Sequence, residues 1–155
     1  MPTENQCSVI EVPTLSWPYA VQIPSRRFRL FVAADVTSDT TEAISEFTLA
    51  ALKTGMAYFC AWGPDCSRFH DIVDEVILGD DLGERLFVGQ NPEDIIMTTW
   101  HERDQLHEAL DFFINWAQPA GDFGINSDHW VAVCVNNPEW AAEIRRQLGQ
   151  AEFRA

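Results

Sequence analysis

The sequence predicts an α/β fold, a three-layer sandwich of Rossmann-like or flavodoxin-like kind with a mostly parallel sheet of four to five strands. Two observations lead to this prediction. Four continuously apolar runs are typical of strands covered on both faces, and each is followed by a segment with helical periodicity. Strands that alternate with helices form parallel sheets through right-handed crossovers. The 155 residues suit a single domain.

The first 27 residues differ from the rest. They hold four of the eight prolines, and proline disfavours both helix interiors and central strands. We therefore expect an extended N-terminal arm over residues 1–27, anchored by Trp17 and Tyr19, and a single α/β domain over residues 28–155. Residues 9–12 are a candidate edge strand of the sheet.

The first two strand and helix pairs are well marked. The run 28–36 predicts a strand, and Asp39 followed by Glu42 indicates the start of a helix that ends at Gly55. A second strand is predicted over 56–62. Gly63 then turns the chain into a second helix, with Pro64 at its first position.

The later pairs follow the same pattern. Residues 79–94 are acidic and rich in turn residues, with 86–88 as a short strand or packed loop. A third strand is predicted over 94–100, and its helix begins near Asp104 and ends before Pro119. After a loop over 118–128, a fourth strand at 129–135 leads to a helix capped by Asn137. For these four core strands we expect the order 2-1-3-4, with 3-2-1-4 as the alternative.

The charge is strongly negative and unevenly distributed. The net charge is −14, and residues 61–128 carry 15 of the 24 acidic residues but only 3 of the 10 basic ones. Such a chain repels nucleic-acid backbones and anionic lipid, and it attracts basic surfaces. We expect a protein partner with a basic surface, no nucleic acid and no membrane.

Cysteine usage and hydropathy predict the compartment. Four cysteines, at 7, 60, 66 and 134, do not form a disulfide framework. No basic segment followed by a long apolar run opens the chain, and no apolar run approaches 18 residues. We expect a soluble, cytoplasmic protein of bacterial type.

The fold itself predicts where a site would lie, because parallel sheets bind ligands beyond the carboxyl ends of their strands. Polar and aromatic residues follow each predicted strand. The ligand-binding candidates are Asp35, Thr37, Trp62, Asp65, Thr99, Trp100, His101 and Asn136, with Asp39 and Asn137 beside them.

Cys66 and His70 are the candidate catalytic pair. A thiol in the first turn of a helix has a lowered pKa, and His70 lies one turn later on an adjoining face. The alternative is that Cys66 packs in the core beside Phe69 and Val73. Weaker alternatives are zinc held by Cys60, Cys66, His70 and His101, or a divalent cation at Asp35, Thr37 and Asp39. We expect no metal and no cofactor.

Two resemblances accompany these residues. The segment Trp62-Gly63-Pro64-Asp65-Cys66 resembles a distorted thioredoxin active site, Trp-Cys-Gly-Pro-Cys, but lacks the first cysteine and inserts Asp65. The wider run from Cys60 to Asp71, of the form C-x-W-G-P-D-C-x-x-x-H-D, together with residues 98–101, is similar to a small uncharacterised bacterial α/β domain family. That resemblance covers most of residues 28–116 and implies no activity.

These observations favour a non-enzymatic, acidic protein-interaction module that uses an aromatic rim around Trp62 and Trp100. An immunity or accessory role in a bacterial defence or toxin operon would suit the charge. The alternative is a thiol-dependent enzyme or small-ligand sensor with its site at the strand ends, where Cys66 would act as the thiolate and His70 as its partner.

Overall fold

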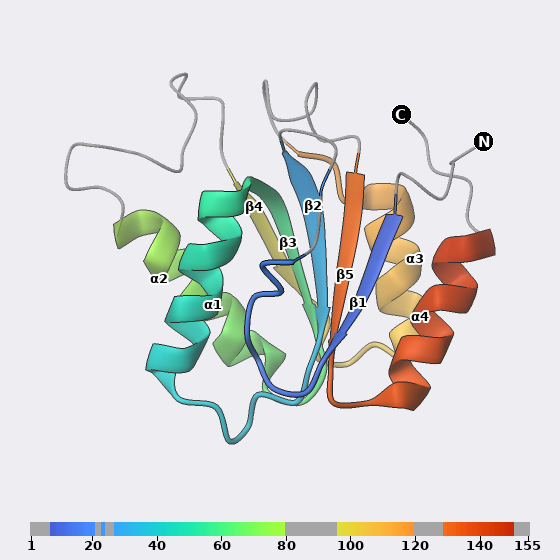
Figure 1. Ribbon diagram of the computed structural model, residues 1–155, viewed down its shortest axis with the longest axis horizontal. Coiled ribbons are helices and arrows are strands. Elements are labelled where there is room, and N and C mark those ends of the chain that lie inside the picture. Colours follow the sequence, from blue (N-terminus) through green and yellow to red (C-terminus); the bar gives the residue numbers. More distant parts are fainter. Residues whose placement is uncertain (1–6, 21–22, 24–26, 80–95, 120–128, 151–155) are drawn as a thin grey trace.

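The structure is a computed structural model that describes residues 7–20, 23, 27–79, 96–119 and 129–150. Within these ranges, five parallel strands form one sheet with four helices, which confirms the predicted α/β sandwich (Figure 1). In chain order, the elements are β1 (Cys7–Val12), β2 (Phe28–Ala33), α1 (Thr41–Thr54), β3 (Met56–Trp62), α2 (Cys66–Gly79), β4 (Met97–Trp100), α3 (Leu106–Trp116), β5 (His129–Val135) and α4 (Pro138–Gln150).

The strand order is β1-β5-β2-β3-β4. For the four core strands this is the alternative order 3-2-1-4, and the first choice, 2-1-3-4, is wrong. The reason is that α3 carries the chain across to the opposite face, so that β5 pairs with β2 rather than with β4. Val9 pairs with Ala132 and Val12 with Val135, which confirms an N-terminal strand at the sheet edge.

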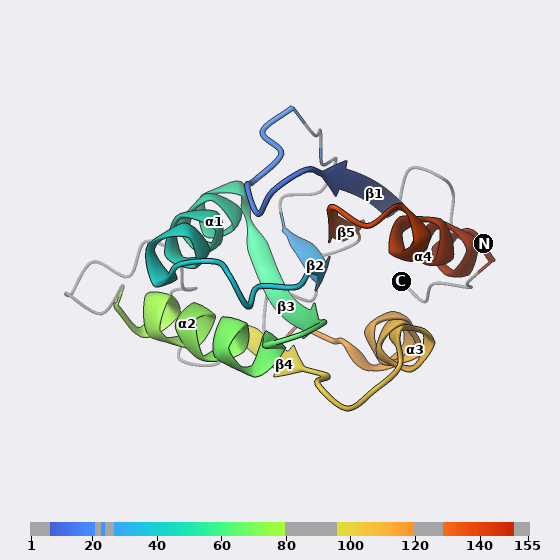
Figure 2. The same cartoon turned by 90° about the horizontal axis from the view of Figure 1, so that it is seen from below.

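The helices cover the two faces of the sheet in pairs. Figure 2 shows α1 and α2 on one face and α3 and α4 on the other. Side chains alternate accordingly along β2: Leu30 and Val32 enter the core below α1 and α2, whereas Phe31 and Ala33 enter the core below α3 and α4. All six residues of β2 are buried, as expected for a central strand covered on both sides.

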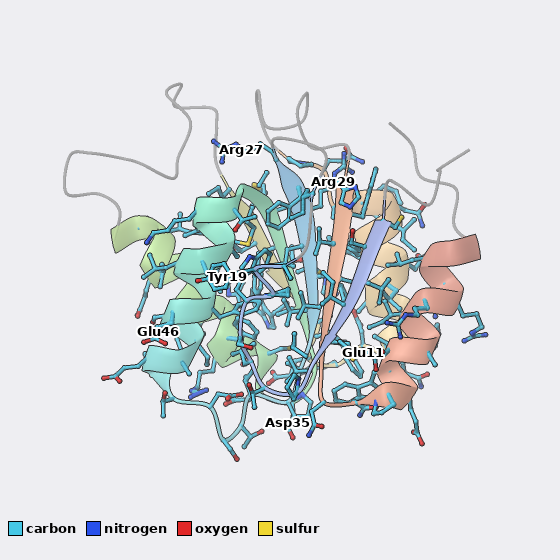
Figure 3. The ribbon with its side chains drawn as sticks, viewed as in Figure 1. Glu11, Tyr19, Arg27, Arg29, Asp35 and Glu46 are labelled. Carbon is cyan, nitrogen blue, oxygen red and sulfur yellow. The ribbon has the colours of Figure 1, made fainter. Side chains whose placement is uncertain are left out.

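The segment after β1 is anchored by one of its two expected aromatic residues. Trp17 is 6% exposed and stacks on Phe28, with ring centroids 5.6 Å apart, while its edge contact with Phe47 is 5.7 Å. Tyr19 is 79% exposed and lies outside this core, so the expectation that it also anchors the segment is wrong (Figure 3). Its hydroxyl favours water in a turn, whereas the Trp17 indole fills apolar space.

Two helix starts differ from the predicted ones. Thr40, not Asp39, caps α1, because its Oγ1 accepts a 3.1 Å hydrogen bond from the Ala43 N–H. Helix α2 begins at Cys66, so Pro64 lies in the preceding turn rather than in the helix. The cap of α4 is confirmed by the 3.1 Å bond from the Trp140 N–H to Asn137 Oδ1.

Two further expectations fall outside the described residues: the strand or loop at 86–88 and nearly all of the loop at 118–128. In the ranges the structure covers, no helix is both long enough and apolar enough to cross a membrane.

Candidate functional site

The carboxyl ends of the strands meet at one edge of the sheet. Figure 3 shows Asp35 at this edge and Arg27 and Arg29 at the opposite one. The predicted site residues therefore follow β2, β3, β4 and β5 onto a common edge, as parallel pairing requires. Their side chains nevertheless divide among three places: a crevice, the α2 side of the sheet and the α3 side.

Unusual backbone conformations are concentrated at this edge. Within the described ranges, the two non-glycine residues with positive φ are Asp65, at 65°, and Asn136, at 47°. Gly63 has φ 122° and lies against Ala34, so that a Cβ at Gly63 would be 2.1 Å from the Ala34 carbonyl oxygen. The turn after β3 thus depends on glycine to let the two loops touch.

Arg68 holds the loop after β2 in place. Its guanidinium donates to the carbonyl oxygens of Val36, at 3.3 Å, and Asp39, and it also contacts Asp65 Oδ2 at 3.4 Å. One side chain of α2 thereby satisfies two carbonyls of a neighbouring loop and binds the turn that precedes its own helix. Sequence inspection missed this role, although the i,i+3 spacing of Asp65 and Arg68 was a visible signal.

Asp35 forms a compact turn of its own. Its Oδ1 accepts hydrogen bonds from both the N–H of Thr37, at 3.0 Å, and the Thr37 hydroxyl. These two bonds stabilise the carboxylate and hold the pKa of Asp35 below its usual range. The predicted pair of Asp35 and Thr37 is therefore in contact, and Oδ2 of Asp35 makes no bond to another described residue.

A crevice of about 520 Å³ opens between the loops that follow β2 and β5. It lies at the point where the strand order reverses, since β2 leads to α1 on one face and β5 leads to α4 on the other. Two of the predicted ligand-binding residues, Asp35 and Asn136, line it. The full lining is Pro13, Thr14, Leu15, Asp35, Ser38, Asp39, Pro64, Val135, Asn136, Asn137 and Trp140.

Cys66 lies beneath this edge, in the core. It is 1% exposed and belongs to the apolar cluster that contains Phe69 and Val73. Burial raises the pKa of the Cys66 thiol. Hydrogen bonds from nearby backbone N–H groups lower this pKa, but by less than burial raises it. The lowered pKa that we expected for a thiol at a helix start is therefore not found. The geometry thus corresponds to the core alternative for this residue.

His70 is turned toward β4 and not toward Cys66. Its Nδ1 lies 3.0 Å from Asp71 Oδ1, and its Nε2 lies 2.9 Å from the Thr98 hydroxyl and 3.4 Å from Asp74 Oδ2. The Thr98 hydroxyl donates its only proton to Asp74 Oδ1 at 2.6 Å, so it can only accept from His70. Both ring nitrogens of His70 therefore lie within hydrogen-bond distance of oxygen atoms on α2 and β4.

Next to this network lies a surface that we call the acidic edge. It consists of Asp71, Asp74, Glu75 and Leu78 on α2, Met97 and Trp100 on β4, and Glu102. The Trp100 ring packs on His70, with centroids 4.3 Å apart, and remains 48% exposed. Leu78 and Met97 are also exposed, so the surface combines apolar side chains with four carboxylates.

The remaining predicted residues lie on the α3 side of the sheet. Trp62 donates from Nε1 to the Asp104 carbonyl at 2.8 Å and packs edge-on against Trp140, with centroids 4.8 Å apart. His101 Nδ1 is 2.8 Å from Asp104 Oδ2, and its ring lies 4.6 Å from that of Phe112. Trp62 and Trp100 therefore do not form one rim.

Two buried groups complete this side. The Thr99 side chain lies beside Cys60, whose thiol is buried so completely that its pKa rises to about 12. In the part of the chain that the structure describes, no three histidine, cysteine, aspartate or glutamate side chains group in a way that could hold a metal ion. All four cysteines are free thiols.

Comparison with known protein families gives a match over most of the chain. The model of a family described as "Domain of unknown function (DUF7684)" matches residues 11–151. No curated protein matches the chain, and no solved structure does.

Proposed function

Since the chain belongs to the DUF7684 family, whose description names no activity, we propose a function from its own geometry: a non-enzymatic module that binds the basic surface of a partner protein through the acidic edge. This proposal rests on one observation: the half-exposed Trp100 packs on His70, whose ring nitrogens contact the α2 carboxylates of Asp71 and Asp74. An indole face and nearby carboxylates together attract lysine and arginine side chains through cation–π contacts and ion pairs.

The position of Trp100 is fixed before any partner arrives. Its ring packs at a tilt against that of His70, and His70 is held by Asp71, Thr98 and Asp74. A surface that is already ordered loses less conformational entropy on binding, so more of the contact energy remains as affinity. Tryptophan is also among the residues that most often dominate binding energy at protein interfaces.

Charge and cysteine usage support a kind of partner and a cellular compartment for this module. The net charge of −14 favours fast association with a basic protein. Four free thiols are typical of a reducing compartment. We place the protein in the bacterial cytoplasm, as an immunity or accessory protein of a defence or toxin operon whose partner has a basic surface.

A thiol-dependent enzyme is the second function that the sequence raised, partly from its thioredoxin-like segment. The geometry gives it less support. Cys66 is buried with a raised pKa, and no hydrogen bond joins it to His70 among the described residues. The other part of that hypothesis, a small-ligand sensor, would use the crevice between the loops that follow β2 and β5.

The test begins with affinity capture using the full chain, and continues with the dissociation constant of the purified partner. Trp100→Ala should weaken binding by about 2 kcal/mol, the usual size of an interface hot spot. Glu75→Lys should slow association, because it places a like charge against the basic partner. Glu75 makes no bond within the described structure, so this change leaves the His70 network intact.

A matched control separates this surface from the overall charge. Glu46 is an exposed residue of α1, and Glu46→Lys changes the net charge by the same amount away from the acidic edge. It should leave the affinity nearly unchanged. Equal effects of Glu46→Lys and Glu75→Lys, or a partner that binds Trp100→Ala as tightly as wild type, would exclude the acidic edge as the binding surface.

A further inference from the structure

The crevice between the loops after β2 and β5 is separate from the acidic edge, and nothing above assigns it a ligand. Its volume of about 520 Å³ lies in the range of small-molecule sites. Loops that follow β1, β2, β3 and β5 all contribute to its walls. Its position at the reversal of strand order is the one where open parallel sheets bind ligands.

The walls of the crevice are already in place. Arg68 holds the carbonyls of Val36 and Asp39, and Gly63 lets the turn after β3 touch the loop after β2. On the far side, the Asn136 N–H donates to the Val12 carbonyl at 2.8 Å. These contacts tie the crevice loops to their neighbours, so that a ligand would not have to order them.

The residues that line the crevice favour a positively charged ligand. Among the described residues that line the crevice, Asp35 and Asp39 are acidic and none is basic. Asp35 stays ionised to low pH, because its bonds from Thr37 lower its pKa. Across the crevice, Asn136 and Asn137 offer amide groups, and the Trp140 indole offers an apolar surface that also attracts cations.

The same lining disfavours anions, although the start of α4 is nearby and helix N-termini often bind phosphate. In the first turn of α4, Pro138 has no N–H, and the N–H of Trp140 is already bonded to Asn137 Oδ1. Glu139 adds a further negative charge to that turn. A phosphate group would therefore meet one available N–H in that turn and several carboxylates.

We propose that the crevice binds a small organic cation, an amine or guanidinium compound with a short apolar body. The cationic group is bound by the carboxylates of Asp35 and Asp39, and the body lies against Trp140. This site is independent of the partner surface around Trp100, so each proposal can fail without the other.

The experiment is a titration of the full chain with agmatine, which carries an ammonium and a guanidinium group on a four-carbon body, followed by ¹⁵N–¹H NMR. At about 0.15 M salt, where diffuse attraction is screened, the amide signals of Asp39 and Asn136 and the Trp140 indole signal should move with a dissociation constant of about 1 mM or lower. The neutral analogue 1,4-butanediol should move none of them.

Variants locate the site. Asp35→Asn with Asp39→Asn should weaken agmatine binding about tenfold or more, because two charge-assisted contacts are lost. Asparagine at position 35 still accepts from Thr37, so the turn is kept. The control pair Glu46→Gln with Asp111→Asn makes the same charge change on α1 and α3, away from both the crevice and the acidic edge, and should bind agmatine like wild type.

Several results would overturn the proposal. Equal weakening by both variant pairs would show diffuse attraction to an acidic protein. Signals that move with phosphate or adenosine monophosphate, and not with agmatine, would show an anion site. Saturation by calcium chloride with the same residues moving would show an inorganic cation site, and absence of any shift with agmatine would exclude the organic cation.

Discussion

Replacing Gly63 by alanine tests the geometry of the candidate site most directly. Gly63 has φ 122°, a conformation that alanine adopts only with strain, and the added Cβ would lie 2.1 Å from the Ala34 carbonyl oxygen and 2.9 Å from its carbon. Both are backbone atoms, so no side chain can rotate away. The Ala34 N–H is also bonded to the Trp62 carbonyl at 3.0 Å, which couples any shift to both loops.

The loss of unfolding free energy in Gly63→Ala follows from two effects, the backbone strain and the steric overlap. Backbone strain of this kind costs about 1–3 kcal/mol, and forcing extra volume into a packed region costs about 1–3 kcal/mol more. We expect Gly63→Ala to lower the free energy of unfolding by about 3 kcal/mol or more. With a urea m value of about 2 kcal/mol/M for a domain of this size, the urea midpoint should fall by about 1.5 M.

The assay is urea unfolding followed by circular dichroism, with Gly149→Ala as the matched control. Gly149 lies in α4, and a Cβ there would meet no atom within 4 Å. Alanine is a better helix former, so this control should be neutral or more stable by about 0.5 kcal/mol. A Gly63→Ala midpoint equal to that of wild type would refute the close approach of the two loops.

Two further predictions follow from burial and from hydrogen bonding. Iodoacetamide should not modify Cys66 in the folded protein at pH 9, because burial raises the pKa of this thiol and blocks access; rapid alkylation, detected by mass spectrometry of the Cys66 peptide, would restore the thiolate hypothesis. His70→Leu should lower the free energy of unfolding by about 2 kcal/mol, because Thr98, Asp71 and Asp74 lose their hydrogen-bond partner in a largely buried network. Glu75→Gln, on the same helix, should change it little, and equal urea midpoints for the two variants would contradict the network.

The elements could be predicted because local patterns determine them. The strands at 56–62 and 129–135 were predicted with the bounds that the structure shows, since each is a continuous apolar run between turn residues. The strand order could not be chosen in the same way. It depends on which face each connecting helix covers, and the apolar stripes of α2 and α3 look alike from the sequence.

The sequence predicted at which edge of the sheet the candidate residues lie, but not which of them contact one another. The strand-end rule placed Asp35 and Asn136 at the same edge of the sheet, and both line the crevice, because chain order and parallel pairing bring their loops together. It could not separate Trp62 from Trp100, since the pleat sends the first toward α3 and α4 and the second toward α2. The partners of His70 include Thr98, which is 28 residues away, and no helical spacing reveals such a contact.

The place of β5 in the sheet constrains the order in which the protein can assemble. β5 separates β1 from β2, and the pairing of Cys7 with Trp130 joins residues more than 120 positions apart. During synthesis, β2, β3 and β4 can pair as they emerge, whereas β1 must wait until β5 has been made. Such distant pairings close long loops and slow folding. The strand β1 is thus made before its partner β5 and incorporated after it, and docking of β1 should accompany the slowest refolding phase.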